Sequence, residues 1–562
     1  MKSISSSAIR RSYSRRSMMK AMVLGVAAPW VVKSSAFASS CGDQIVRIGA
    51  VRAPNTMNPF ATWSSFRPTT FTYDFLVGVD AQRFGDRRGF AKEWSVADDE
   101  LTWTFKIWPG LKWSDGKPAT ARDAAFTYIY LRQSMGTPNE LKVGWNNTAG
   151  LENVESITAI DDETLQIVTK SPTRWPIDNT ILIVPEHIWK DISYADARST
   201  FRNSPPLVGT GPMIVAEFQP SQFTRLVPNE HFRGGKPAIA GVIENYFNTN
   251  DAVAQGLKSG SLDFGNGITA AQYDVLAKNS DIEVGRVPTE QLNFLAFNTA
   301  SGEGAGSTKA LQDPAFRDAI GYAIDQKVIV DRAFRGHADP GVGLVMPAAA
   351  AYYSDLSDIT RRFDLKEAAR RLDTAGYQAT DGDGVRKDKE GKRFQLELIT
   401  GTVSGTLEMP VAVVQLIAGW LGKLGIPVSV TQLESGALQS RKASVTRGGG
   451  KWDLLVAGSW LSPSPRDLLV LGKSDAVLNN ASYWKNKEFD RLASQVDVTV
   501  DNKQGRELVD QAVRLIYKEA PYIVLCYPVS LYAHRKDCFQ GWGPEKEFSL
   551  WSYFPFDRLK PV

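Results

Sequence analysis

The stretch 101–128 constrains the fold more than any other part of the chain, because two different periodicities follow each other in it. Its first seven residues alternate between apolar and polar side chains, which predicts a strand with one buried face. Pro109-Gly110 indicates a turn, and residues 111–113 are expected to return as a short strand. Thr120 then predicts the start of a helix, with Asp123 at its positive end. A hairpin that leads into a helix favours a mixed α/β fold.

The first 38 residues are predicted to be an export signal rather than part of the folded protein. They hold seven of the 65 basic residues and none of the 61 acidic ones, so the remainder of the chain has a net charge of −3. Residues 14–20 resemble the twin-arginine motif. The apolar run 21–32 is shorter than a membrane span of about 20 residues, and Ala36-Phe37-Ala38 is a small-x-small cleavage site. A slightly acidic body argues against nucleic acid as a partner.

Three cysteines leave the disulfide pattern open. Eleven residues separate Cys526 from Cys538, which suits a hairpin-linked bond in an oxidising compartment. Two free thiols, or a bond to Cys41, are the alternatives. Cys41 is also a candidate for lipidation, although the residues before it lack the Leu expected of a lipobox.

The sequence predicts no catalytic residues, no metal and no cofactor. The motifs H-E-x-x-H, G-x-S-x-G, G-x-G-x-x-G and C-x-x-C are missing. The glycines at 209 and 211 precede a strand-like segment rather than a helix with Lys, which excludes a phosphate loop. Residues 381–384 predict a β-turn, because a calcium loop would need a third acidic ligand and flanking helices. The four histidines are far apart in the sequence: His187, His231, His337 and His534.

Several motifs, taken in order, resemble those of the family 5 extracellular solute-binding proteins, which include the dipeptide- and oligopeptide-binding receptors of ABC importers. Trp103-Thr104-Phe105 and the residues up to Asp123 are similar to the family's W-T-F-x-L-R-x-G-V signature and its continuation. Residues 208–213 resemble V-G-T-G-P-Y, Asn58-Pro59 resembles the L-N-P loop, and residues 316–325 resemble V-R-x-A-I-x-Y-A-I-D.

The resemblance implies a two-lobed α/β periplasmic-binding-protein fold (type II, cluster C-like) with an extra subdomain in the first lobe. The expected boundaries are 43–72, 208–288 and 520–562 for the core of the first lobe, 73–207 for its extra subdomain, and 289–519 for the second lobe. A periplasmic monomer is expected, which captures a solute between the lobes and delivers it to the permease and ATPase of an ABC importer. An exported hydrolase and a non-transport solute sensor are the alternatives.

The resemblance also places the ligand site in loops that follow strands, where ligands of open α/β sheets gather. The expected ligand-binding residues are Trp63, Asn266, Asn298, Gly458, Ser459, Trp460 and Ser462. Trp460 is expected to be a stacking platform, with a core residue of the second lobe as the alternative.

In the same loop the sequence departs from the family's motif at a position that bears on the charge of the ligand. Peptide-binding family members hold the ligand's α-amino group with an Asp in G-W-x-x-D-Y-x-D-P. Here Ser462 or Pro463 stands where that Asp is expected, and Asp467 is expected to cap a helix at Leu468. A buried ammonium without a carboxylate is costly. Unless another acid supplies the charge, we expect a modified peptide or another peptide-like or oligosaccharide-sized compound rather than an ordinary peptide with a free amino terminus.

Overall fold

The 101–128 stretch forms the centre of a small antiparallel sheet, as its alternation predicts. The computed structural model describes residues 41–51, 53–61, 66–78, 89–141, 143, 149–301, 307–379, 382–401, 411–444, 452–462, 464–476, 479–542, 556 and 558–562. Strand β3 (Thr102–Ile107) lies between β2 (Ala91–Val96) and β5 (Thr164–Thr169), and β4 (Val154–Ala159) forms the other edge. The alternate apolar residues of β3 are fully buried, which confirms the predicted strand.

Helix α3 (Ala121–Ser134) begins where the sequence predicts. The side chain of Thr120 accepts from the Arg122 N–H, and the Asp123 carboxylate accepts from the Thr120 N–H at 2.8 Å in a capping box. The predicted return strand at 111–113 is wrong: only an isolated bridge joins Lys112 to Pro118. The backbone of this segment bonds within its own loop, as in Trp113 N–H to Lys117 O, so it does not extend the sheet.

A twelve-stranded sheet forms the centre of both lobes. In its first half, β1 (Ile45–Ala50) pairs in parallel with β8 (Gly241–Tyr246) and β9 (Phe264–Asn266), and β7 (Phe223–Pro228) and β6 (Met213–Gln219) follow β8 antiparallel. In the other half, β13 (Leu396–Gly401) lies in parallel between β14 (Val428–Leu433) and β15 (Leu454–Trp460). A separate strand pair joins β17 (Phe539–Gln540) to β18 (Lys560–Pro561).

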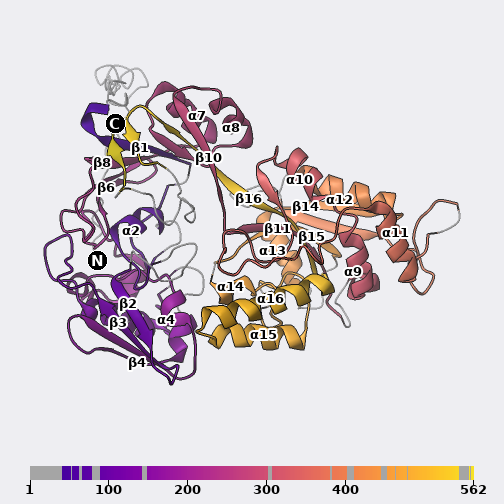
Figure 1. Ribbon diagram of the computed structural model, residues 1–562, viewed down its shortest axis with the longest axis horizontal. Helices are drawn as coiled ribbons and strands as arrows, with labels where there is room; N and C mark the ends of the chain where they lie inside the picture. Colours follow the sequence, from indigo (N-terminus) through magenta and orange to yellow (C-terminus); the bar gives the residue numbers. More distant parts are fainter. Residues whose placement is uncertain are drawn as a thin grey trace, which may run out of the picture. The chain divides into compact units, whose positions relative to one another are not determined.

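Strand β16 (Tyr522–Arg535) belongs to both halves of the sheet. Its first part pairs with β11 (Gln291–Phe297) and β12 (Ala338–Pro340), and its second part with β10 (Ile282–Pro288) and β9. Only Thr289 and Glu290 separate β10 from β11, and the Thr289 hydroxyl donates to Pro528 O at 2.6 Å. Figure 1 shows β16 in yellow beside β10. Two neighbouring strands therefore carry the chain from one lobe to the other.

Each lobe has its own apolar core. The first-lobe core combines the small sheet with β1 and β6–β8, and a second cluster lies under α7 (Asn250–Ser259) and α8 (Ala270–Leu276). The second-lobe cores lie on the two faces of β11 and β15. Five other helices of the first lobe are described: α2 (Phe66–Thr72), α4 (Trp175–Asp178), α5 (Glu186–Trp189), α6 (Tyr194–Ser199) and α3.

Helices cover both faces of the second-lobe sheet, and α15 and α16 lie side by side (Figure 1). Asp313 and Asp364 cap α9 and α11 through their side chains. The helices are α9 (Pro314–Gly321), α10 (Gln326–Ala333), α11 (Leu365–Thr374), α12 (Val411–Lys423), α13 (Ser435–Ser444), α14 (Pro465–Leu468), α15 (Lys487–Val498) and α16 (Asn502–Glu519).

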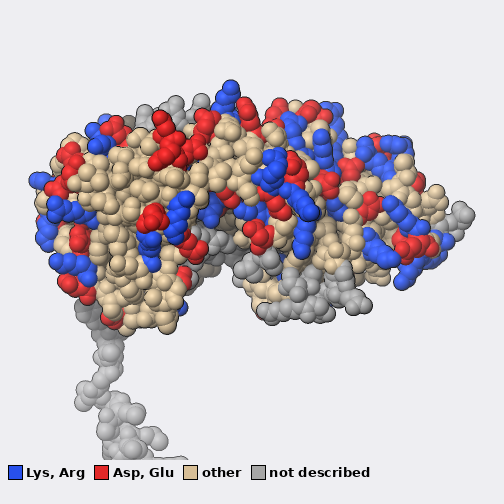
Figure 2. Space-filling view, turned by 90° about the horizontal axis from the view of Figure 1, so that it is seen from below, with Lys and Arg blue, Asp and Glu red and all other residues tan. Residues whose placement is uncertain are grey.

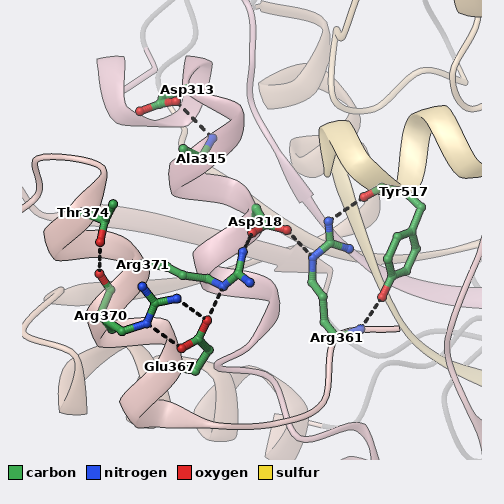
Figure 3. A network of polar contacts seen from close by, with 9 residues as sticks. All are labelled: Asp313, Ala315, Asp318, Arg361, Glu367, Arg370, Arg371, Thr374 and Tyr517. Atoms are coloured by element: carbon green, nitrogen blue, oxygen red, sulfur yellow. Dashed lines mark hydrogen bonds and ion pairs between the residues drawn. The ribbon is translucent and has the colours of Figure 1, made fainter. Parts of the chain in front are cut away.

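A charged network joins three of these helices within the second lobe (Figure 3). Asp318 on α9 accepts from Arg361 Nε and from Arg371 Nη1, both at 2.8 Å. Arg361 also donates to Tyr517 O on α16 at 2.6 Å, and Arg371 donates to Glu367 at 2.8 Å. We call this set the Asp318 network.

Of the alternatives that the sequence leaves open, the structure has a bond to Cys41: the disulfide joins Cys41 to Cys538, and Cys526 is a free thiol. Cys526 lies inside β16, whose extended chain continues to Arg535, so the residues between the two cysteines do not form a hairpin. Burial raises the pKa of the Cys526 thiol to about 12. In the described part of the chain, no helix has both the length and the apolar character to cross a bilayer.

Glycine is required at positions 209 and 211 because the backbone there approaches α2 closely. A Cβ at either position would overlap a backbone carbonyl of that helix, Thr72 O or Phe71 O, and neither glycine lies in the left-handed region.

Candidate solute-binding site beside the lobe crossing

The end of β15 lies against the start of β11, directly after the chain has crossed between lobes. Trp460 pairs with Gln291, Ser459 with Leu292, and Gly458 with Asn293. The next residue, Leu461, donates its N–H to Glu290 O at 2.9 Å. Gly458, Ser459 and Trp460 were predicted to lie in a loop after a strand; they are instead the last residues of β15 and pair with β11 beside the crossing. Trp460 is half-buried and stands outside the apolar cores of the second lobe that the structure describes.

Asn266 lies beside the same crossing on the first-lobe side. It ends β9 opposite Tyr532, and the following Gly267 N–H donates to Leu531 O at 3.0 Å. The Asn266 side chain is 5% exposed, and its Nδ2 has no hydrogen-bond partner among the residues described. An unpaired buried donor costs about 1–3 kcal/mol. This amide is thus the strongest indication that an acceptor from outside the fold binds here.

Two further amides at the crossing were missed by the sequence analysis. Gln291 and Asn293 are buried on β11, and Asn293 Nδ2 makes a weak contact with Cys526 Sγ at 3.7 Å. The signal was present in the sequence, because both amides alternate with apolar residues in the QLNFLAF strand. In the pairing of β11 with β15, Gln291 lies opposite Trp460 and Asn293 lies opposite Gly458. Trp460 and Gly458 are both predicted site residues.

Asn298 and Trp63 stand apart from this group. Phe297 pairs with Leu454 at the end of β11–β15 opposite Trp460, so Asn298 lies roughly 20 Å away at about 3.3 Å per residue. Asn298 is fully buried, with Nδ2 donating to Trp452 O at 2.9 Å and Oδ1 accepting from Ala300 N–H at 3.1 Å. Trp63 lies outside the described residues.

Asp467 is the acidic group of the loop after β15. The predicted cap at Leu468 is wrong: α14 begins at Pro465 with Ser464 as its N-cap residue, and Asp467 lies inside it. Burial raises the pKa of the Asp467 carboxyl to about 6; Arg466 opposes this rise, and the Asp178 carboxylate adds to it. Ser462 Oγ accepts from the Ser464 N–H at 3.2 Å and hydrogen-bonds Asp467. A carboxyl titrating near pH 6 would gain charge beside a bound cation.

Two histidines contact aspartates, one within the first lobe and one between the lobes. His187 Nε2 lies 2.8 Å from Asp115 Oδ2, which joins α5 to the turn at 114–116, as expected for a structural histidine. His337 Nε2 lies 3.3 Å from Asp274 Oδ1 on α8. On the face that Figure 2 shows, basic and acidic side chains of the described residues are intermixed. A solute approaching that face meets charges of both signs.

Known proteins of the predicted family match nearly the whole chain. Residues 87–474 match the model of the bacterial extracellular solute-binding proteins, family 5 Middle. The chain is 26% identical over 503 residues to the oligopeptide-binding protein AppA of Bacillus subtilis, covering 88% of each protein. It is 26% identical over 552 residues to the glutathione-binding protein GsiB of Shigella flexneri, covering 94% of this chain and 97% of the relative.

Solved structures share the fold. HbpA2 from Haemophilus parasuis superimposes with a TM-score of 0.76 at 21% identity, covering 92% of this chain and all of that structure. AppA from Bacillus subtilis in complex with a nonapeptide has a TM-score of 0.66 at 23% identity, covering 92% and 98%. Both comparisons support the predicted two-lobed α/β architecture.

Proposed function

The chain belongs to the family 5 bacterial extracellular solute-binding proteins, and from this premise we propose that it binds a peptide-like solute beside the lobe crossing. The observation that carries the proposal is the unpartnered Nδ2 of buried Asn266, which lies at the crossing together with the Gln291–Trp460 strand pair. A donor amide and an aromatic surface suit a ligand that offers carbonyl or carboxylate oxygens and an apolar group.

The ligand class follows from the relatives and from Asp467. Relatives named for an oligopeptide, for glutathione and for a D,D-dipeptide all bind compounds with peptide bonds. A carboxyl with a pKa near 6 binds an amine less readily than a fully ionised one. We therefore favour a modified peptide or peptide conjugate, with Asp467 as the acid that meets any cationic group. Native mass spectrometry of protein purified without refolding identifies the bound compound.

Trp460 tests the position of the site. As a stacking surface, Trp460→Ala should lose about 1–3 kcal/mol of binding to the compound identified by mass spectrometry. The melting temperature should change little, since Trp460 is half-buried and outside the described cores. Titration calorimetry and thermal unfolding measure the two effects. An unchanged affinity with a clear fall in melting temperature, as expected for a buried core aromatic losing about 3–5 kcal/mol of stability, would remove this loop from the site.

We propose that the solute leaves this protein chemically unchanged and passes to the permease and ATPase of an ABC importer. Family members are binding proteins of transport systems. Incubating the purified protein with its own co-purified compound tests the first part. Formation of a product would favour an exported hydrolase.

We propose export to the periplasm through the twin-arginine segment at 14–20, with the mature chain beginning after Ala38. Replacing both Arg15 and Arg16 by Lys should leave precursor in the cytoplasm, which fractionation and immunoblotting detect. Normal export of the double variant would assign the chain to the general secretory route. The disulfide of Cys41 occupies the thiol that lipidation would need.

We also propose that the lobes divide close to the predicted bounds, 43–72, 208–288 and 520–562 against 289–519 with 73–207 as the extra subdomain, except that residues 520–527 pack in the second-lobe cores. The paired strands β10–β11 and β16 support rotation about the crossing.

A further inference from the structure

A second contact joins the lobes, and it is formed by elements other than the crossing strands. Trp175 and Ile177 of α4 pack in the first-lobe core, whereas the apolar face of α16 packs in the second-lobe core. Arg174, directly before α4, donates Nη1 to Val500 O at 2.6 Å and to Asn502 Oδ1 at 3.1 Å. The Val500 side chain also packs against the first-lobe core. The turn between α15 and α16 is therefore attached to α4.

The contact contains a buried ion pair. Arg174 Nε lies 3.4 Å from Asp178 Oδ2, and both side chains are 5% exposed. The same Asp178 oxygen accepts from Ser464 Oγ of the second lobe at 2.9 Å. The Tyr352 hydroxyl in turn donates a hydrogen bond to Asn502 Oδ1 at 3.3 Å. Each member of the first-lobe ion pair thus makes a hydrogen bond with the second lobe: Arg174 donates to Val500 O and Asn502 Oδ1, and Asp178 accepts from Ser464 Oγ.

Such a pair is sensitive to the lobe arrangement. Charges removed from water gain little unless their remaining hydrogen bonds are made, so a buried pair defines a geometry more than it adds stability. Val500, Asn502 and Ser464 supply those bonds only when the lobes are in contact. Once the lobes separate, water solvates Arg174 and Asp178 instead. The pair therefore favours one relative orientation of the lobes.

We propose that Arg174 and Asp178 form an interlobe latch that holds the lobes together and controls how readily they open for the solute. The latch rests on the proposed hinge at the crossing strands. Asp467 adds to the dependence on Arg174, because its carboxyl is close enough to that of Asp178 for the two negative charges to repel each other. Without the guanidinium, two acidic groups would be buried together with Arg466 as the nearby cation, and the closed arrangement would lose its main counter-charge.

The latch is tested in the unliganded mature chain with spin labels attached at S156C and K518C. Double electron–electron resonance measures the distance between the two labels. Both positions are exposed, one on β4 and the other on α16. Arg174→Met should raise the ratio of open to closed molecules about tenfold or more. The double variant S464A/N502A keeps the first-lobe ion pair and removes two second-lobe partners, so it should raise the ratio by a smaller factor, about threefold to tenfold, even if Arg174→Met folds poorly.

Arg371→Met is the matched control, because the partners of Arg371 among the described residues, Asp318 and Glu367, both belong to the second lobe. It should leave the label distances of the wild-type protein unchanged. Distances in S464A/N502A identical to those of the wild-type protein would overturn the latch. A wild-type protein whose distances do not shorten when its own co-purified compound is added would instead contradict the proposed function.

Discussion

Two charged clusters of similar composition differ in what they hold together. The Asp318 network joins α9, α11 and α16 inside one lobe (Figure 3), whereas Arg174 and Asp178 bond across the lobes. The network keeps its partners in every arrangement of the lobes, so its loss should be measured as stability. The interlobe pair keeps its partners only in the closed arrangement, so its loss should be measured as a change in lobe opening.

The largest effect is expected from the Asp318 network. Arg361 is 6% exposed, and its guanidinium serves both Asp318 and Tyr517 O. Arg361→Met should lower the free energy of unfolding by about 3–5 kcal/mol, because it leaves the Asp318 carboxylate short of a partner in a half-buried site. Chemical denaturation measures the change. Arg370→Met is the control: Arg370 bonds Glu367 from an exposed position and should change the melting temperature little.

The pH dependence of stability tests the part of the comparison that concerns the latch. The pKa of Asp467 is raised to about 6 by burial, above its ordinary value of 3.8. The folded protein therefore binds more protons than the unfolded chain between these values, so this group lowers stability as pH rises from about 4 to about 6. The full loss in the free energy of unfolding from this group, about 1–3 kcal/mol, is present above pH 6.

Asp467→Asn removes that titration. The variant should gain free energy of unfolding relative to the wild-type protein as pH rises through this window, and the gain should level off above pH 6–7. Denaturant titrations of both proteins at pH 4, 5, 6 and 7.5 measure the difference. A difference that is constant over this range would mean that burial does not perturb Asp467.

The smallest effect is expected at an exposed contact between the lobes. Asp274 on α8 receives Arg335 Nη2 at 2.9 Å and His337 Nε2 at 3.3 Å from the second lobe. Solvent screens this group, so Asp274→Asn should change the ratio of open to closed molecules less than twofold. The labels at S156C and K518C report it. A change as large as that of Arg174→Met would show that contacts between lobes act alike whether buried or exposed.

Local features of the fold were readable from the sequence. Alternation of apolar and polar residues predicts β3, and Thr120 predicts the start of α3, because neighbouring residues decide these features. The Cys41–Cys538 bond was not readable, because it joins residues 497 positions apart that only the folded chain brings together.

The candidate site was readable in part, for a similar reason. Asn266 and Trp460 were predicted to lie in loops that follow strands; they are instead the last residues of β9 and β15, and both lie beside the crossing. Asn298 does follow a strand, but β11 and β15 are antiparallel, so it lies at the far end of the pair. Strand direction is a property of the sheet that spacing along the chain does not contain. Arg174 was missed because its segment reads as a loop, and its burial depends on contact with Val500 and Asn502.

Small-angle scattering with and without the bound compound tests the central claim most directly. The account predicts that the mature protein, freed of its co-purified compound, has the larger radius of gyration, and that adding the compound identified by mass spectrometry to saturation reduces it. An identical scattering profile at saturation would contradict capture of the solute by closure of two lobes about the β10–β11 and β16 crossing.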